Sequence, residues 1–301
     1  MADAPSGSGR AGFLLRVRRF LSRPLRQQGR ALSNRVRGIV SSVPRPTRLP
    51  FGAWWIKRND NLAETLLTGS FESAELAFVE KFLKPGMTVL DVGAHQGLYS
   101  LLASRHVGPS GRVFSFEPSP RERRALRLNL ALNFCRNVAV QAVALGNEET
   151  TADLYVVQGS QTGCNSLKPP EVVSSTKPVP VRVTTLDHWL AQNRIDHVDF
   201  IKLDVEGAEL GVLQGAQSFL TRDLGVVILC ELEDVRSAPW GHKAKDVAAY
   251  LRGLGFKWFQ CEPSGKLLPL PDNAERYEGN FVAARPESMD ALKRMTNDGA
   301  R

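Results

Sequence analysis

Short apolar runs and longer amphipathic segments alternate along the chain from about residue 73 onward. Short apolar runs between turn residues are typical of buried strands, and apolar side chains at helical spacing are typical of helices. We expect strands at residues 88–92, 112–117, 138–145, 198–203, 224–232, 256–261 and 280–284. We expect helices at residues 73–83, 97–104, 120–133, 186–193, 210–220 and 244–253. This alternation predicts an α/β fold, a mostly parallel sheet with helices on both faces.

One segment, residues 158–180, interrupts this alternation. It is rich in Gly, Ser, Pro and Thr, which favours a long loop or hairpin over the ligand site. In this interpretation residues 51–290 form the folded domain, between an arm at residues 1–50 and a tail at residues 291–301.

The basic character of the chain is concentrated in the arm. Residues 1–50 contain eleven arginines, no lysine and one acid, Asp3, which gives the arm a charge of +10. Because the whole chain carries +8, the remaining 251 residues sum to −2. The folded domain is therefore close to neutral.

Four interpretations of the arm stay open. Leu14, Val17, Leu21 and Leu25 recur at helical spacing with arginines between them, although Pro24 weakens any such helix. A solvated basic arm is the simplest interpretation. A helix on an anionic membrane surface, formed within residues 13–40, also fits an apolar stripe flanked by arginine. A nucleic-acid-binding arm and an organelle transit peptide are the other two.

The cysteine pattern indicates a reducing compartment. The four cysteines are scattered, with no C-x-x-C pair and no histidine at ligand spacing, which argues against structural zinc and a disulfide framework. No apolar run approaches the roughly 20 residues of a transmembrane helix, and arginines interrupt the N-terminal apolar segments. We expect a cytoplasmic protein, with peripheral membrane contact through residues 13–40 as one interpretation.

Residues at the carboxyl ends of the first two predicted strands of the sheet indicate a nucleoside cofactor, since ligands bind there in such sheets. Gly93 and Gly97 allow a tight turn after the first strand, and Glu117, at the end of the next, is placed to bind ribose hydroxyls. Asp91 precedes this turn. Its carboxylate would repel a pyrophosphate but suits a cationic cofactor such as S-adenosylmethionine, which favours a methyltransferase over a dehydrogenase.

Four motifs, in order along the chain, resemble the FkbM-like family of S-adenosylmethionine-dependent methyltransferases. They are Val89-Leu-Asp-Val-Gly-Ala-His-Gln-Gly-Leu-Tyr-Ser100, Phe114-Ser-Phe-Glu-Pro118, Thr185-Leu-Asp187 and Ile201-Lys-Leu-Asp-Val-Glu-Gly-Ala-Glu209. The similarity runs from about residue 71 to residue 281 and leaves residues 1–50 outside. The last motif is the most specific. His95 stands where the family usually has Asn, and Leu98 where an aromatic residue or Ile is common.

The resemblance implies a class I methyltransferase fold, with a Rossmann-like seven-stranded, mostly parallel sheet whose last strand is antiparallel. It also implies O-methylation of a small molecule, a sugar or a lipid-linked glycan. By position, Asp91, Gly93 and Gly97 would hold the amino-acid part of the cofactor, Glu117 the ribose, and residues 142–144 the adenine. The full set of expected cofactor-binding residues is Asp91, Gly93, Ala94, Gly97, Glu117, Pro118, Ala142, Val143 and Asp204.

Three acids follow the apolar run at residues 200–203, and stability does not explain such crowding. An acceptor hydroxyl has to lose its proton during methyl transfer, which requires a base. Asp204 is the first candidate, and Glu206 and Glu231 come next; Glu209 fits a role at the helix dipole instead. The acids could also bind a divalent metal, but the resemblance does not require one and none is expected. Asn165, Ser166 and Glu72 are expected either to contact the acceptor or to be structural.

Two other classes of function are considered. The basic arm would suit a nucleic-acid-binding protein or an RNA methyltransferase, but the folded domain is near neutral and lacks an Asn-Pro-Pro-Tyr-like strand end for stacking a flipped base. Nucleic acid is therefore not favoured as a partner. A degenerate fold that binds cofactor without catalysis is opposed by the intact Asp91, Glu117 and Asp204.

Overall fold

The computed structural model describes residues 45–57, 65–66, 68–159 and 161–288. Most of the predicted arm and the whole predicted C-terminal tail lie outside the described residues, as does the candidate membrane segment at residues 13–40. At the end of the predicted arm, β1 (Arg45–Arg48) forms a strand. In the part of the chain that the structure describes, no helix is long and apolar enough to span a membrane.

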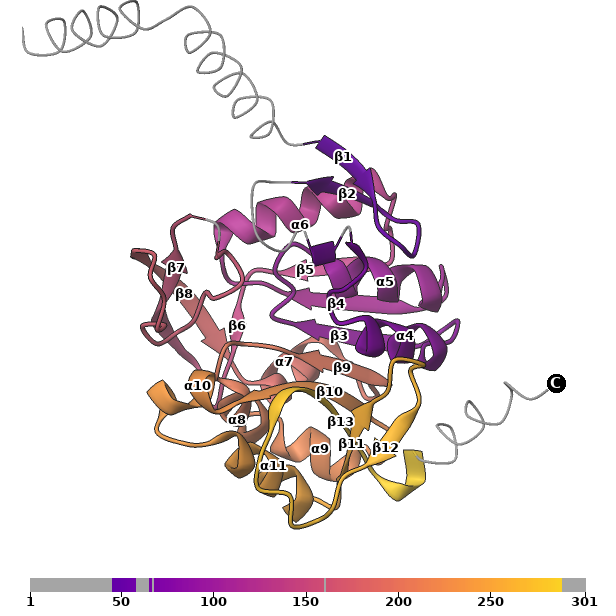
Figure 1. Ribbon diagram of the computed structural model, residues 1–301, viewed down its shortest axis with the longest axis vertical. Coiled ribbons are helices and arrows are strands. Elements are labelled where there is room, and N and C mark those ends of the chain that lie inside the picture. Colours follow the sequence, from indigo (N-terminus) through magenta and orange to yellow (C-terminus); the bar gives the residue numbers. More distant parts are fainter. Residues whose placement is uncertain (1–44, 58–64, 67, 160, 289–301) are drawn as a thin grey trace, which may run out of the picture. The chain divides into compact units, whose positions relative to one another are not determined.

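The central sheet is mostly parallel, as predicted (Figure 1). The strands β10, β9, β3, β4 and β5 pair in parallel, and β13 is antiparallel to its two neighbours β10 and β11. In spatial order the eight strands are β12 (Leu267–Pro269), β11 (Lys257–Cys261), β13 (Glu278–Ala284), β10 (Val227–Glu233), β9 (Phe200–Leu203), β3 (Thr88–Val92), β4 (Arg112–Phe116) and β5 (Val138–Gln141). Seven of these strands correspond to the predicted ones.

The eighth strand, β12, is a correction to the predicted seven-stranded sheet. It has three residues and pairs antiparallel with β11 at the sheet edge. Such a short strand has no apolar alternation that a sequence pattern could show.

Helices cover both faces of the sheet because its strands are apolar on both sides. One face packs against α4 (Ser73–Phe82), α5 (Leu98–Val107) and α6 (Pro120–Leu132), and Phe78, Leu101 and Leu126 belong to its core. The other face packs against α7 (Leu186–Asn193), α8 (Glu209–Gln214), α9 (Gln217–Arg222) and α11 (Ala244–Gly253). Ile228 and Leu229, adjacent on β10, belong to these two cores on opposite faces.

The predicted strand at residues 138–145 is two strands in two sheets. The chain leaves the central sheet after β5, and β6 (Ala144–Leu145) pairs in parallel with β8 (Thr176–Thr184). β8 also pairs antiparallel along its length with β7 (Thr150–Val157), which was not predicted. Residues 176–180, predicted as loop, therefore belong to a strand. The rest of the segment, residues 158–175, is the connection between β7 and β8 and corresponds to the predicted long loop.

The predicted helix at residues 210–220 is divided into α8 and α9. A Cβ atom at Gly215 would lie 2.0 Å from the carbonyl oxygen of Gly146, so the two backbones are in contact at the division. Asp187, on α7, caps the N-terminus of α9. Its carboxylate accepts hydrogen bonds from the backbone N–H groups of Ser218 and Phe219 at 2.8 Å each.

A two-stranded sheet of β1 and β2 (Trp54–Lys57) lies beside α6 (Figure 1). Two asparagines, the buried Asn129 and the partly exposed Asn133, attach β2 to the helix. Asn133 accepts from the N–H of Trp54 at 2.7 Å and donates to its carbonyl, and Asn129 accepts from the N–H of Ile56 at 2.9 Å. The edge of β2 is thus held by side chains that provide the hydrogen bonds of a neighbouring strand.

A buried arginine after β13 joins two helix ends. Arg285 donates from Nε to the carbonyl of Leu254 at 2.8 Å, and from its two Nη atoms to the carbonyls of Asp223 at 3.0 Å and Leu220 at 2.6 Å. The guanidinium also lies 4.2 Å from the ring centroid of Phe256. These carbonyls end α9 and α11, where backbone acceptors lack helical partners.

Replacing Arg285 with methionine should therefore lower the free energy of unfolding by about 3 kcal/mol, because three buried carbonyls lose their donors. Urea denaturation of the cofactor-free protein measures this. The matched control is Arg276→Met, which changes an exposed arginine and should cost less than about 0.5 kcal/mol. Equal losses in the two variants would contradict the bridging role.

Candidate active site

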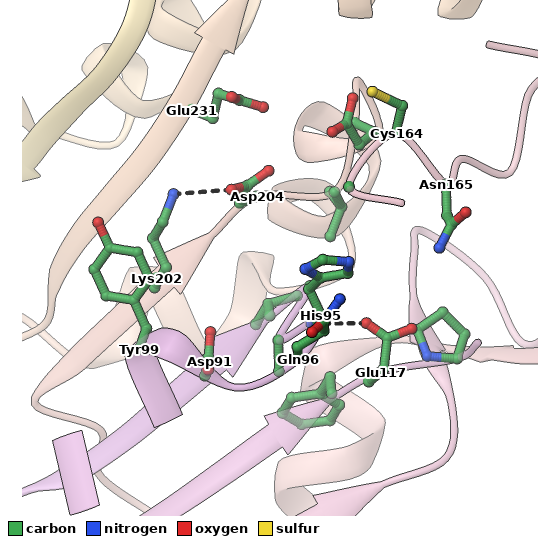
Figure 2. A pocket seen from close by; sticks show the side chains of 18 of the residues that line it. Asp91, His95, Gln96, Tyr99, Glu117, Cys164, Asn165, Lys202, Asp204 and Glu231 are labelled. Carbon is green, nitrogen blue, oxygen red and sulfur yellow. Dashed lines mark hydrogen bonds and ion pairs between the residues drawn. The ribbon is translucent and has the colours of Figure 1, made fainter. Parts of the chain in front are cut away.

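A cavity of about 460 Å³ opens at the carboxyl ends of β3, β4, β9 and β10 (Figure 2). Residues of the turns after β3, β4 and β9 form its floor, and residues 161–167, from the connection between β7 and β8, line one side. Trp55, Phe71 and Tyr99 provide aromatic lining. The cavity thus occupies the position at which sheets of this kind bind ligands.

The turn after β3 depends on glycine at position 93. Gly93 has φ +85°, and a Cβ atom there would lie 1.7 Å from the carbonyl oxygen of Asp204. Any side chain at this position would push the ends of β3 and β9 apart. Gly93 therefore brings the two turns that carry Asp91 and Asp204 into contact.

Glu117 is tied to the same turn. Its carboxylate accepts hydrogen bonds from the backbone N–H of His95 at 2.8 Å and from that of Ser119 at 2.7 Å (Figure 2). Burial raises the pKa of Glu117 to about 8, against the effect of these two donors. The carboxyl group lines the cavity and retains lone pairs for a further donor.

Asp91, the last acid of β3, lies on the cavity floor and accepts a hydrogen bond from the hydroxyl of Ser100 on α5. Burial raises its pKa to about 6, while the Ser100 hydroxyl and the charge of Lys202 act in the opposite direction. Asp91 is therefore a carboxylate at neutral pH.

Among the described residues, the one lysine that lines the cavity is Lys202, on β9. Its side chain is 2% exposed. The ammonium lies 3.3 Å from Asp204 Oδ2 (Figure 2). It also donates to Asn280 Oδ1 at 2.7 Å. A buried charge needs such partners, since unpaired burial would cost several kcal/mol.

The partners of Lys202 belong to a larger ring of contacts. Asn280 donates to Glu72 Oε1 at 3.0 Å, and Tyr99 donates its hydroxyl to Glu72 Oε2 at 2.5 Å. The Lys202 ammonium lies 5.2 Å from the ring centroid of Tyr99, within the range of a cation–π interaction. Side chains from β9, β13, α5 and the residue before α4 are thereby fixed together.

The positive charge of Lys202 lowers the pKa of one acid in the cavity, Asp204, relative to its neighbours. Burial raises the pKa of Asp204, but the Lys202 charge and hydrogen bonds from Glu231 and Lys202 outweigh it, so this pKa lies below its ordinary value. Burial and the charge of Asp204 raise the pKa of Glu206 to about 8 and that of Glu231 well above its ordinary value. Asp204 is therefore the acid of this cluster whose ionised form is favoured, and burial and the Asp204 charge favour the protonated forms of Glu206 and Glu231.

The three candidate bases do come together. One carboxylate oxygen from each of Asp204, Glu206 and Glu231 lies within 4.8 Å of those of the other two. A divalent cation could use such oxygens as ligands. Two cationic side chains already adjoin the cluster, since Arg236 Nε lies 3.0 Å from Glu206 Oε2 and Lys202 contacts Asp204.

Other predicted residues fall into two groups. Ala94, Pro118 and Val143 line the cavity. Gly97 does not; it precedes α5 with φ +96°, and a Cβ atom there would meet Leu126, so its role is in packing. Ala142 is exposed and also lies outside the lining. The chain leaves the sheet at this point, and the expected adenine contact therefore falls on its successors, Val143 and Ala144.

The residues expected near the acceptor all line the cavity, and all three also have structural contacts, those of Glu72 being with Asn280 and Tyr99. Asn165 accepts from the N–H of Val157 at 2.9 Å, and Ser166 donates to the carbonyl of Glu206 at 3.0 Å. Glu209 lies outside the lining and accepts from the N–H groups of Val205 and Gly207. Glu209 therefore shapes the turn after β9.

Sequence reasoning missed Lys202, Tyr99 and Trp55. Lys202 stands inside the apolar run at residues 200–203, and a lysine in a strand buried on both faces requires a nearby acid. That signal could have found it. Tyr99 and Trp55 had no signal, because apolar spacing does not distinguish a core aromatic from one that lines a cavity.

The lining fits S-adenosylmethionine. The donor carries a sulfonium and an ammonium group, and the cavity offers Asp91 and Asp204 as carboxylates. Glu117 adds a buried acceptor, and Phe116, Val143 and Leu145 add apolar surface for a flat base. No arginine lines the cavity within the described residues, so a pyrophosphate would find carboxylates where it needs cations.

Comparison with known proteins agrees with this chemistry. Residues 91–258 match the family model of the methyltransferase FkbM domain. The chain is 25% identical to the 31-O-demethyl-FK506 methyltransferase FkbM of Streptomyces tacrolimicus, over 72% of this chain and 90% of that protein. It is also 25% identical to the 2-O-methyltransferase NoeI of Sinorhizobium fredii, over 46% of this chain and 61% of that protein.

A third relative is much longer. The AMB antimetabolite synthetase AmbE of Pseudomonas aeruginosa is 28% identical over 70% of this chain, which spans only 11% of AmbE. The chain thus spans less than two thirds of the length of both AmbE and NoeI. The family match covers more than half of the chain. The protein belongs to the FkbM-domain methyltransferases, enzymes whose methyl donor is S-adenosylmethionine.

Proposed function

We propose that this enzyme methylates a hydroxyl oxygen of an uncharged small molecule, sugar or lipid-linked glycan. The names of two relatives support oxygen as the methylated atom, since one is a 2-O-methyltransferase and another a 31-O-demethyl-FK506 methyltransferase. The observation that carries the proposal is the ionised carboxylate of Asp204, which Lys202 holds at the floor of the cavity. A hydroxyl acceptor needs such a base.

In this proposal each part of the cavity has one task. S-adenosylmethionine supplies a methyl group on a sulfonium, which is already a good leaving group. Asp91, Gly93 and Ala94 hold the amino-acid part of the donor, Glu117 holds the ribose, and residues 143–144 hold the adenine. Asp204 then accepts the proton of the acceptor hydroxyl, and the lining residues hold the acceptor in line with the methyl group.

The charges of the lining favour an uncharged acceptor. In the part of the chain that the structure describes, six acids line the cavity, and the one lysine there is already paired with Asp204. A phosphate or carboxylate on the acceptor would meet acidic groups without a free cation. Trp55, Phe71 and Tyr99 offer aromatic faces, and the buried Nε1 of Trp55 has no hydrogen-bond partner among the described residues. This donor is positioned to bind an acceptor oxygen.

The direct test uses the full-length purified protein with S-adenosylmethionine and extracts of neutral glycans, glycolipids and small metabolites. Mass spectrometry should find a product heavier by one methylene group than its precursor. Fragmentation should place the methyl group on oxygen. Methylation of nitrogen or carbon, or of RNA rather than of any small molecule, would contradict the proposal.

Glu117→Ala should weaken binding of S-adenosylhomocysteine by about 1–3 kcal/mol, because the ribose loses a buried acceptor. Calorimetry at neutral pH measures this. Glu278→Ala removes an exposed acid of β13 and serves as the matched control, with unchanged affinity expected. An unchanged affinity in folded Glu117→Ala would remove Glu117 from the ribose site.

Asp204→Asn should reduce turnover about 10²-fold with little change in cofactor affinity, since the amide keeps the shape but cannot accept the proton. Glu231→Gln is the matched control. Glu231 is protonated, so its amide analogue should retain most of the turnover. Full activity in Asp204→Asn would exclude it as the base. Activity that a chelator abolishes and Mg²⁺ restores would instead favour a metal at the three carboxylates.

Lys202→Met should move the acid limb of the pH profile of kcat/KM to higher pH. The reason is that Lys202 lowers the pKa of Asp204, so its removal lets Asp204 take up a proton nearer to neutrality. Lys202→Arg keeps the charge and should leave the limb close to its original position. An acid limb that stays in place in folded Lys202→Met would refute this control of Asp204.

A further inference from the structure

A second cavity, of about 610 Å³, lies at the amino ends of β4 and β5, where Arg112 begins one strand and Asn137 precedes the other. Its lining includes Arg105, Arg112 and Arg136 together with Phe134. The methyl-transfer cavity is at the carboxyl ends of the same parallel strands. The two cavities therefore lie at opposite edges of the sheet.

The surface around this second cavity is strongly basic. Residues 105–137 contain seven arginines, no lysine and only two acids, Glu117 and Glu122, both of which are buried. Within the described part of the chain, one of the seven, Arg121, pairs with a carboxylate, that of Glu122. The other six arginines leave a positive charge that the folded domain does not neutralise.

The outer face of α6 extends this charge. Arg124, Arg127 and Leu128 are exposed and, at helical spacing, share one side of the helix. Like charges at this spacing lower the stability of a helix. Their clustering is therefore better explained by an anionic partner than by folding.

Large apolar side chains stand among these arginines. Phe134 is 82% exposed, Leu128 47% and Trp54, on the strand attached to α6, 41%. Phe134 also has φ +54°, a conformation that non-glycine residues rarely adopt. We define the basic face by these three residues together with Arg105, Arg112, Arg124, Arg127 and Arg136.

We propose that the basic face docks on the surface of a lipid bilayer that contains anionic phospholipids. In this arrangement the arginines bind headgroup phosphates, for which the guanidinium has the matching fork of donors. The cavity between Arg105, Arg112 and Arg136 receives one headgroup. Phe134, Leu128 and Trp54 enter the interface, where apolar and aromatic side chains gain from leaving water.

The exposed aliphatic side chain of Leu128 favours a bilayer over nucleic acid as the partner of this face. Phosphates of RNA would also attract the arginines, and bases could stack on Phe134 or Trp54. Leu128 offers a base no stacking surface, yet it stands beside Arg124 and Arg127 on the exposed side of α6. In a bilayer interface both Leu128 and Phe134 are buried, whereas nucleic acid would leave Leu128 without a contact.

The test is sedimentation of the full-length protein with two kinds of vesicle, phosphatidylcholine alone and phosphatidylcholine mixed with phosphatidylserine. The triple variant Arg105→Gln/Arg112→Gln/Arg136→Gln should lose affinity for the mixed vesicles on the order of 10²-fold. Leu128→Ser and Phe134→Ser should each also weaken it. Methyl-donor binding should be unchanged in all of them, because none of the substituted residues lines that cavity.

The matched control is Arg222→Gln/Lys257→Gln/Arg276→Gln, which removes the same charge from exposed positions outside the basic face. All variants retain the N-terminal arm, so its contribution cancels. A triple variant that binds no more weakly than this control would overturn the proposal. Loss in the arginine variant without loss in Leu128→Ser and Phe134→Ser, accompanied by tight binding of single-stranded RNA, would overturn it in favour of nucleic acid.

Discussion

The buried ammonium of Lys202 is the constraint on which the arrangement around the methyl-transfer cavity depends. An unpaired positive charge inside the sheet would cost several kcal/mol, so its partners have to occupy fixed positions. Asp204 and Asn280 contact it directly, and Asn280 in turn holds Glu72. Segments far apart in the chain thus meet around one charge. The close approach of Gly93 to Asp204 then aligns the donor side of the cavity with this cluster.

The same charge limits how many acids can ionise. Carboxyl groups that share a buried site cannot all be negative, and one lysine stabilises one of them. Asp204 is the carboxyl group that Lys202 keeps ionised. Burial favours the protonated forms of Glu206 and Glu231. A protonated carboxyl group is a hydrogen-bond donor as well as an acceptor. The acid-rich wall can therefore offer both kinds of contact to a polyhydroxylated ligand without the repulsion that six carboxylates would generate.

Much of the fold could be predicted because its signals are local. Strands such as β3 and β9 are buried on both faces and appear in the sequence as apolar runs. The predicted helix at residues 244–253 is confirmed, since α11 has the same bounds. The division at residues 142–143 could not be predicted, because it depends on pairing with β8, some forty residues later. α8 and α9 divide where Gly215 meets Gly146, a contact between residues that lie even farther apart in sequence.

The acids of the site could be named from their order along the chain, because the carboxyl ends of parallel strands converge. Their protonation states could not, since these depend on distances to Lys202 and on burial. Lys202 itself was visible but was included in an apolar run. The three carboxylates of Asp204, Glu206 and Glu231 do converge, whereas their roles in proton transfer stay predictions.

The two tryptophans of β2 have a consequence for how the enzyme responds to its surroundings. Neighbouring side chains on a strand point to opposite sides, so Trp54 is directed to the basic face and Trp55, 1% exposed, lines the methyl-transfer cavity. In the proposed docking, a contact that orders Trp54 is expected to restrict the strand that also carries Trp55, before the acceptor arrives. One peptide unit thus separates a side chain of the basic face from a side chain of the methyl-transfer cavity.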